Sequence, residues 1–159
     1  MSNVPWPNEA APGLAPFRLD VPDSWSAIEP PDALIALLGP ERDGFRPNVV
    51  VFGQRLAAAV TVAEVAEHAA ADSGVVVERE ERGGADGELP AAIRRSAEVV
   101  RGLEIHHVVV TTEAGDASPT GLRSVYTLIG SCQAAHVAED QPVLQKMISS
   151  FTVRVPATA

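Results

Sequence analysis

Apolar and polar residues follow strand spacing along most of the chain. Residues 17–21 alternate apolar and polar side chains, which predicts a half-buried strand. Residues 22–24 are turn formers that end this strand, and Trp25 is then expected to lie over the edge of the core. The short apolar run at 33–39 is bounded by prolines and a glycine, and its length favours a second strand.

The stretch GFRPNVVVFGQRL, residues 44–56, contains four consecutive apolar residues from Val49 to Phe52. Such a run indicates either a binding loop or a strand that is buried on both faces. We favour the strand, because a strand with one face in water would alternate apolar and polar residues. This strand is expected to be covered on both sides or to lie at the centre of the sheet. Pro47 suits the entrance of a strand, since it has no backbone N–H to donate.

A helix is predicted over residues 62–72. Thr61 and Glu64 have the spacing of a capping box, in which each side chain accepts a hydrogen bond from the backbone N–H of the other residue. Gly74 is a suitable end for the helix. The apolar residues of its core-facing side are Val62, Val65, Ala66 and Ala69.

Four further strands are expected after this helix. The stretch from residue 75 begins as a strand and continues into a charged turn, where residues 78–82 are better read as a solvated strand end than as a contact surface. Residues 91–100, 103–113 and 122–136 then predict an antiparallel meander. Gly102 would allow a tight reversal within the meander, and Gly130 is a candidate β-bulge.

The last element is a helix over residues 139–151. Asp140 is a reasonable N-cap, and Pro142 falls in the first turn, where its missing N–H does no harm. One face carries an apolar stripe at helical spacing that is expected to pack on the core and not to bind a cofactor; it consists of Val143, Leu144, Met147, Ile148 and Phe151.

Residues 1–16 contain four prolines and are expected to form a flexible, extended arm. Trp6 within the arm either docks on the body or remains a lone aromatic residue in the tail, and the sequence leaves both interpretations open. Residues 17–155 then form a single domain, since 159 residues suit one sizeable core.

The formal net charge of −9 argues against binding to nucleic acid or to anionic lipid. No segment approaches the roughly 20 apolar residues needed to span a bilayer. The first 16 residues lack the basic start and apolar run of a secretory signal, so we expect a cytoplasmic protein. The single cysteine, Cys132, excludes an internal disulfide and fits a reducing compartment.

The sequence offers little catalytic chemistry. It contains no glycine-rich phosphate loop and no nucleophile elbow, and Cys132 is best read as a small buried hydrophobic residue. His106 and His107 are adjacent in a predicted strand, so they point to opposite faces and cannot close on one metal ion. His68 and His136 are read as a surface histidine and a hydrogen-bonded strand end.

The paired carboxylates at 80–81 and 139–140 fall in predicted loops or element ends, where no cleft is indicated. We therefore expect no enzyme, no catalytic residue, no metal site and no cofactor.

Four local stretches, in this order, carry a family resemblance: FRLDVPDSW, GFRPNVVVFGQRL, VYTLIGSC and MISSF. Together they resemble the actinobacterial LpqN-like family of PsbP/Mog-type fold, over residues 17–153. The resemblance implies an α+β fold, in which a curved antiparallel sheet of about six or seven strands is flanked by helices as an α/β/α sandwich. It also implies a mainly non-catalytic role, since PsbP proteins attach to a photosynthetic assembly and Mog-type proteins bind a small GTPase.

LpqN-like proteins are often envelope lipoproteins, but this chain shows no signal or lipobox, which favours a cytoplasmic adaptor. The leading hypothesis is therefore a protein-binding module, an adaptor or a chaperone for a secretion-linked partner whose identity the sequence does not give. The alternative is a binder of a small apolar, lipid-like ligand held in a pocket under the helices. An exposed edge strand, with the first strand as candidate, would allow homodimerisation by sheet extension.

Overall fold

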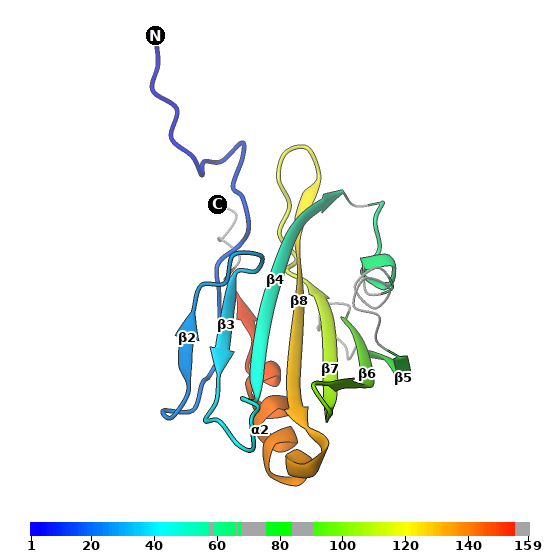
Figure 1. The fold of residues 1–159 in the computed structure, drawn as a ribbon. Helices are drawn as coiled ribbons and strands as arrows, with labels where there is room; N and C mark the ends of the chain where they lie inside the picture. The colour runs from blue at the N-terminus through cyan, green and yellow to red at the C-terminus, as the bar shows by residue number, and fades with distance from the viewer. Residues whose placement is uncertain (58, 66, 68–75, 84–90, 155–159) are drawn as a thin grey trace.

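The structure is a computed structural model that describes the chain except for residues 58, 66, 68–75, 84–90 and 155–159. For residues 76–83, 91 and 92 only the backbone is described. Its main feature is one seven-stranded sheet, in which every pair of neighbouring strands is antiparallel, so the predicted α+β class is confirmed (Figure 1). The strand order is β2-β3-β4-β8-β7-β6-β5.

The strands of the large sheet differ greatly in length, from the three residues of β2 to the twelve of β8. Their bounds are β2 Ser26–Ile28, β3 Ile35–Leu38, β4 Asn48–Ala57, β5 Val76–Gly83, β6 Ala91–Val100, β7 Leu103–Glu113 and β8 Leu122–Gln133. The predicted meander is β6-β7-β8, and the short β2 was not predicted. The charged residues 78–82 continue β5 and do not form the predicted turn.

A second, two-stranded sheet joins the two ends of the domain. It pairs β1, Phe17–Arg18, with β9, Thr152–Val153. The first strand is therefore not an edge of the large sheet, whose edges are β2 and β5. Homodimerisation through either edge remains a prediction.

The helix α2, Val137–Ser149, follows β8 through a 3₁₀ turn, η1, Ala134–His136. It begins at Val137 with His136 as N-cap, so the prediction of Asp140 as N-cap was wrong. Asp140 is instead buried within α2, where its carboxylate lies 3.1 Å from the Arg42 guanidinium. Pro142 consequently lies inside the helix, in its second turn. The helix begins earlier than predicted because the 3₁₀ turn after β8 leads straight into it, and the capping preference of a single residue does not indicate this.

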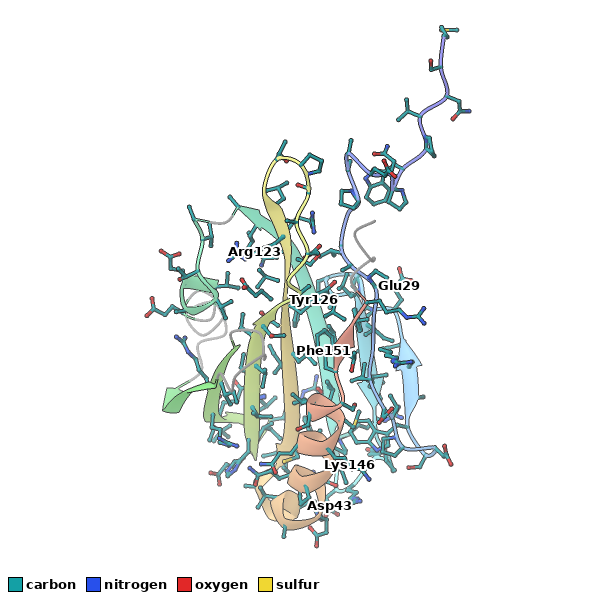
Figure 2. The ribbon with its side chains drawn as sticks, turned by 180° about the vertical axis from the view of Figure 1, so that it is seen from behind. Glu29, Asp43, Arg123, Tyr126, Lys146 and Phe151 are labelled. Carbon is teal, nitrogen blue, oxygen red and sulfur yellow. The ribbon has the colours of Figure 1, made fainter. Side chains whose placement is uncertain are left out.

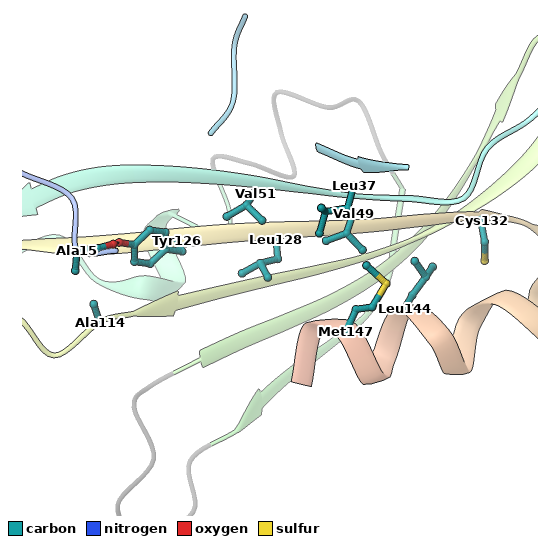
Figure 3. Packing of buried hydrophobic residues seen from close by; sticks show 10 residues of the cluster. All are labelled: Ala15, Leu37, Val49, Val51, Ala114, Tyr126, Leu128, Cys132, Leu144 and Met147. Carbon is teal, nitrogen blue, oxygen red and sulfur yellow. The ribbon is translucent and has the colours of Figure 1, made fainter. Parts of the chain in front are cut away.

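The core lies between the sheet and α2 (Figure 3). The predicted apolar stripe is confirmed for its four members within α2, with Leu144 and Met147 fully buried against the sheet, whereas Phe151 follows the end of the helix and still packs on the core. The buried cluster consists of Ala15, Leu37, Val49, Val51, Ala114, Tyr126, Leu128, Cys132, Leu144 and Met147.

The run from Val49 to Phe52 forms an internal strand whose two faces are buried to different degrees. The run is a strand, and β4 lies between β3 and β8, as an internal position requires. Val49 and Val51 face α2 and are fully buried, whereas Val50 and Phe52 on the opposite face are only half-buried. The run therefore fits the interpretation as an internal strand of the sheet, whereas its burial is complete only on the α2 face.

The capping box of the first helix is confirmed. The Thr61 backbone N–H donates to Glu64 Oε2 at 2.7 Å, and the Glu64 N–H donates to Thr61 Oγ1 at 3.2 Å. Helical residues 62–65 and 67 follow; the remainder of the predicted helix, including His68, and the stop at Gly74 lie outside the described residues. Arg123 donates to the backbone oxygens of residues 57 and 60, which holds this segment to the sheet face opposite α2.

Gly130 is not a β-bulge, because the register of β8 runs through it without a shift to both neighbouring strands. A Cβ atom at this position would lie 3.1 Å from Ile148 Cδ1 and 3.1 Å from Val108 Cγ1. The glycine is therefore explained by the close approach of α2 to the sheet. The predicted reversal at Gly102 is confirmed: Arg101 and Gly102 have φ of 50° and 80°, as a tight hairpin turn with two positive φ values requires.

Candidate functional site

The N-terminal arm is attached to the sheet at Ala15. The Ala15 N–H donates to Ser124 Oγ at 3.0 Å, and the Tyr126 hydroxyl donates to the Ala15 carbonyl oxygen. Tyr126 also contacts the rings of Phe17 and Phe151, with centroid distances of 5.4 and 5.3 Å (Figure 2). Ala15 itself is buried, so the arm that leaves the body ends before it, and not at residue 16 as expected.

A buried ion pair supports this attachment point. Arg55 donates to the Asp116 carboxylate and to Ser124 Oγ, while Asp116 accepts hydrogen bonds from the Ser124 N–H at 2.8 Å and from its hydroxyl at 2.9 Å. Burial alone would raise the pKa of Asp116, but the Ser124 hydrogen bonds and the Arg55 charge outweigh it and hold the pKa below its usual value. The carboxylate is thus ionised at neutral pH and fixes Ser124 for its contact with Ala15.

Beyond Ala15 the arm carries large apolar side chains into solvent. Val4 is 75% exposed and Trp6 is 73% exposed. The indole of Trp6 leans on Gly13, where an added Cβ would lie 2.9 Å from the ring, so Trp6 packs within the arm and leaves most of its surface free. Asn8 Oδ1 accepts from the N–H groups of residues 10 and 11, which folds this part of the arm into a turn.

The histidines behave largely as the strand alternation predicts. His106 pairs with Cys132 and His107 with Ser131, which places the two imidazoles on opposite faces of β7. His136 is hydrogen-bonded, with its Nε2 2.8 Å from Asp43 Oδ2, but it lies in the 3₁₀ turn η1 and not at the end of a strand as expected. Among the residues that the structure describes, no three His, Cys, Asp or Glu side chains are grouped to hold a metal ion.

Sequence reasoning missed a hydrogen-bonded chain across β6, β7 and β8. His107 Nδ1 lies 2.6 Å from Ser131 Oγ, and His107 Nε2 lies 2.6 Å from Glu98 Oε1. The order Ser, His, Glu is that of a nucleophile, a base and an orienting carboxylate. However, Ser131 is buried near the end of β8, so a substrate carbonyl cannot reach its hydroxyl. These hydrogen bonds therefore give the polar side chains of Ser131, His107 and Glu98 partners on the sheet face.

Two polar residues of β6 are also buried. Arg94 and Ser96, which oppose the apolar face of this strand, are both buried. Of the carboxylates that were considered in pairs, residues 80 and 81 lie in β5, and Asp140 is engaged by Arg42. No carboxylate pair facing a common cleft is formed by the described side chains.

A small hollow lies between α2 and the sheet. It has a volume of about 50 Å³, and its lining includes Arg95, His106, Cys132, Gln141 and Leu144. Sites for drug-sized or lipid-like ligands usually measure about 300–1,000 Å³. This hollow has room for a few water molecules and does not support the apolar-ligand hypothesis.

Cys132, which lines this hollow, is expected to be unreactive. Burial, with the nearby Asp140 charge, raises the pKa of its thiol to about 11. At pH 7 only on the order of one thiol in 10,000 would then be ionised, and the thiolate is the reactive form. Reaction with a thiol reagent such as DTNB should be at least about a hundredfold slower in the native protein than in the urea-unfolded protein. Equal rates in both states would show that Cys132 is accessible and activated.

The large antiparallel sheet, with a terminal helix on one face and the chain ends paired beside it, defines an α+β protein of PsbP/LpqN-like fold. The particular structures it resembles are these. LpqN of Mycobacterium tuberculosis, a protein involved in cell envelope biogenesis, matches with a TM-score of 0.68 and 16% identity over 89% of this chain and 85% of LpqN. The cyanobacterial PsbP of Synechocystis matches with a TM-score of 0.61 and 14% identity over 89% of this chain and 95% of that protein.

A crystal structure from Bacteroides thetaiotaomicron also matches, with a TM-score of 0.56 and 11% identity over 88% of this chain, which spans about half (46%) of that structure. No protein-family model and no curated protein sequence matches the chain. Identities this low show a shared fold and no more. The PsbP/LpqN-like fold expected from the sequence is thus confirmed, whereas membership of the actinobacterial family remains a prediction. None of the described helices is long and apolar enough to cross a membrane.

Proposed function

We propose that the protein is a non-catalytic protein-binding module that acts as an adaptor, or as a chaperone for a secretion-linked partner. The observation that carries this proposal is the arm, which is fixed to the sheet at Ala15 and presents Val4 and Trp6 to solvent. Tryptophan is the residue type most enriched among the energetically dominant contacts of protein interfaces. Fixing one end of the arm also reduces the entropy that a partner must overcome when it binds.

The buried state of the candidate nucleophiles supports a role without bond-making. Ser131 is buried near the end of β8 and held by His107, and Cys132 is buried with a raised thiol pKa. The fold likeness to LpqN, which is involved in cell envelope biogenesis, makes proteins of envelope assembly suitable first partners to test. We further propose that the module meets its partner in the cytoplasm.

The test is affinity capture from the cytoplasmic fraction of the native organism, with the full chain and two variants. The wild-type chain should recover one protein in stoichiometric amount, and Trp6→Ala should weaken its binding by about tenfold or more, because a tryptophan anchor is removed. Ile28→Ser is the matched control, since Ile28 is also an exposed apolar residue (49%) but lies on the distant β2 edge.

Full binding by Trp6→Ala would show that the arm is not the contact surface. Absence of any stoichiometric partner for the intact wild-type chain would contradict the function itself. Recovery of the partner from the envelope fraction alone would contradict the cytoplasmic location.

A further inference from the structure

The tip of the β6–β7 hairpin is a second exposed apolar feature. Val99 is 73% exposed and Val100 is 39% exposed, whereas most other valines of the long strands are buried or half-buried. Val100 pairs with Leu103 across the turn formed by Arg101 and Gly102. This two-residue turn with positive φ values fixes the shape of the tip, so its valines are displayed in a set geometry.

We propose that this tip inserts into an apolar groove with a basic rim on a protein partner, and that it forms a contact surface separate from the arm. Successive strand residues point to opposite faces, so Val99 and Val100 project to the two sides of the hairpin. A flat surface could cover only one of them. A groove that encloses the tip buries both.

The charges beside the tip favour a basic rim. Glu104, which pairs with Val99 across the hairpin, has a side chain that is 60% exposed, and Glu98 next to Val99 is 35% exposed. Arg101 supplies one opposing charge at the turn itself, His106 Nε2 lies 3.4 Å from Glu104 Oε1, and His107 holds one oxygen of Glu98. With two carboxylates at the base of the tip and a net charge of −9, the chain is repelled by anionic lipid and attracted to a cationic protein surface.

The tip and the arm lie at opposite ends of the sheet. Ser124, near the start of β8, holds the arm, while Gln133 at the end of β8 pairs with Ile105, three residues beyond the hairpin turn. Figure 1 shows the N-terminus at one end of β8 and α2 beside the other end, where β8 finishes. Nine residue steps along a strand separate the two points by about 30 Å. One partner on each end is therefore sterically allowed, which is the geometry of an adaptor; this inference rests on the proposed protein-binding function.

The experiment places a photo-crosslinking residue, benzoylphenylalanine, at position 99 of the full chain. The protein that it labels in native lysate is identified, purified and titrated against the wild-type chain. Val99→Thr/Val100→Thr should raise the Kd about tenfold or more, since threonine keeps the shape and strand preference of valine but adds a buried hydroxyl. Because both positions are exposed, the melting temperature of this double variant should be unchanged.

The basic rim is tested with salt and with charge reversal. Glu104→Lys alone should weaken binding relative to the wild-type chain, because it places a positive charge opposite the basic rim. Raising the salt from 0.05 to 0.3 M should weaken the wild-type complex several-fold. Trp6→Ala should leave the cross-link yield at position 99 unchanged, because the arm is a separate contact surface. If only Trp6→Ala keeps full binding to its partner, the proposed role of the arm is wrong. If only the Val99→Thr/Val100→Thr variant keeps full binding, the proposed role of the tip is wrong.

Three results would overturn the proposal. The first is an unchanged Kd for Val99→Thr/Val100→Thr, or no labelled protein at all. The second is wild-type co-sedimentation with phosphatidylcholine vesicles, with or without one quarter phosphatidylglycerol, that the double variant loses, because the tip would then be a membrane contact. The third is a concentration-dependent dimer in sedimentation that the double variant abolishes, because the occupant would then be a second copy of this chain.

Discussion

Replacing Asp116 with alanine is expected to lower the free energy of unfolding by about 3 kcal/mol. The side chains of Arg55 and Asp116 are only 17% and 10% exposed, so the substitution leaves a largely buried guanidinium without its counter-ion. It also removes both hydrogen bonds that Asp116 accepts from Ser124. Urea denaturation followed by circular dichroism measures the change. Because Ser124 in turn holds Ala15, the variant should also expose residues 1–14 to limited proteolysis at lower protease concentration.

The Asp116 carboxylate should also make the stability of the folded protein decrease at low pH. The folded-state pKa of Asp116 lies below the usual value of 3.8, so the folded protein binds this proton less tightly than the unfolded chain does. Its stabilisation is therefore complete above about pH 5 and is lost as the pH falls through the folded-state pKa. Asp116→Asn removes the titrating group, so the difference in stability between wild type and Asp116→Asn should shrink between pH 5 and the acid limit of folding.

The matched control is Asp32→Ala, which removes an exposed carboxylate elsewhere on the surface. Its effect at neutral pH should stay within about 0.5 kcal/mol. If Asp116→Ala behaved like Asp32→Ala, the ion pair with Arg55 would not contribute to the fold, and the arm would need another explanation for its attachment.

Local sequence features predicted local structure well in this chain. The capping box of Thr61 and Glu64, the reversal at Gly102 and the opposite orientation of His106 and His107 each depend on residues at most three positions apart. The apolar spacing of α2 also identified its buried face, because an amphipathic helix shows which side packs on the core without reference to its neighbours. The order of the strands in the meander followed from their short connections.

The candidate surfaces could be predicted only in part, because they depend on which distant segments become neighbours. The hydrogen bond between Ala15 and Ser124 joins residues 109 positions apart, and no pattern near either residue indicates it. His107 was recognised as a polar residue in a strand, but its two partners come from the strands on either side. The sequence indicates Trp6 as an aromatic residue of the arm. The exposure of Val99, in contrast, depends on how far the β6–β7 hairpin extends beyond its neighbouring strands β5 and β8.

Gly130 is the clearest case in which a local interpretation failed for a tertiary reason. A glycine in a strand indicates either a bulge or the close approach of another segment, and here α2 supplies the second. Gly130→Val is expected to lower the free energy of unfolding by about 3 kcal/mol, because the added atoms collide with Ile148 and Val108 and force α2 away from the sheet. Thermal and urea denaturation of the purified variant measure this loss.

A graded series separates this collision from a simple change in strand preference. Gly130→Ala adds only the Cβ atom and should cost no more than about 1 kcal/mol, since the end of the Ile148 side chain can shift by a few tenths of an ångström. Ile148→Val deletes the Cδ1 atom that the new methyl group meets, so Gly130→Ala should cost less in that background than in the wild-type chain. Equal costs in both backgrounds, together with a well-tolerated Gly130→Val, would mean that α2 does not press on β8 at this point. The glycine would then not be explained by the packing of α2 on the sheet.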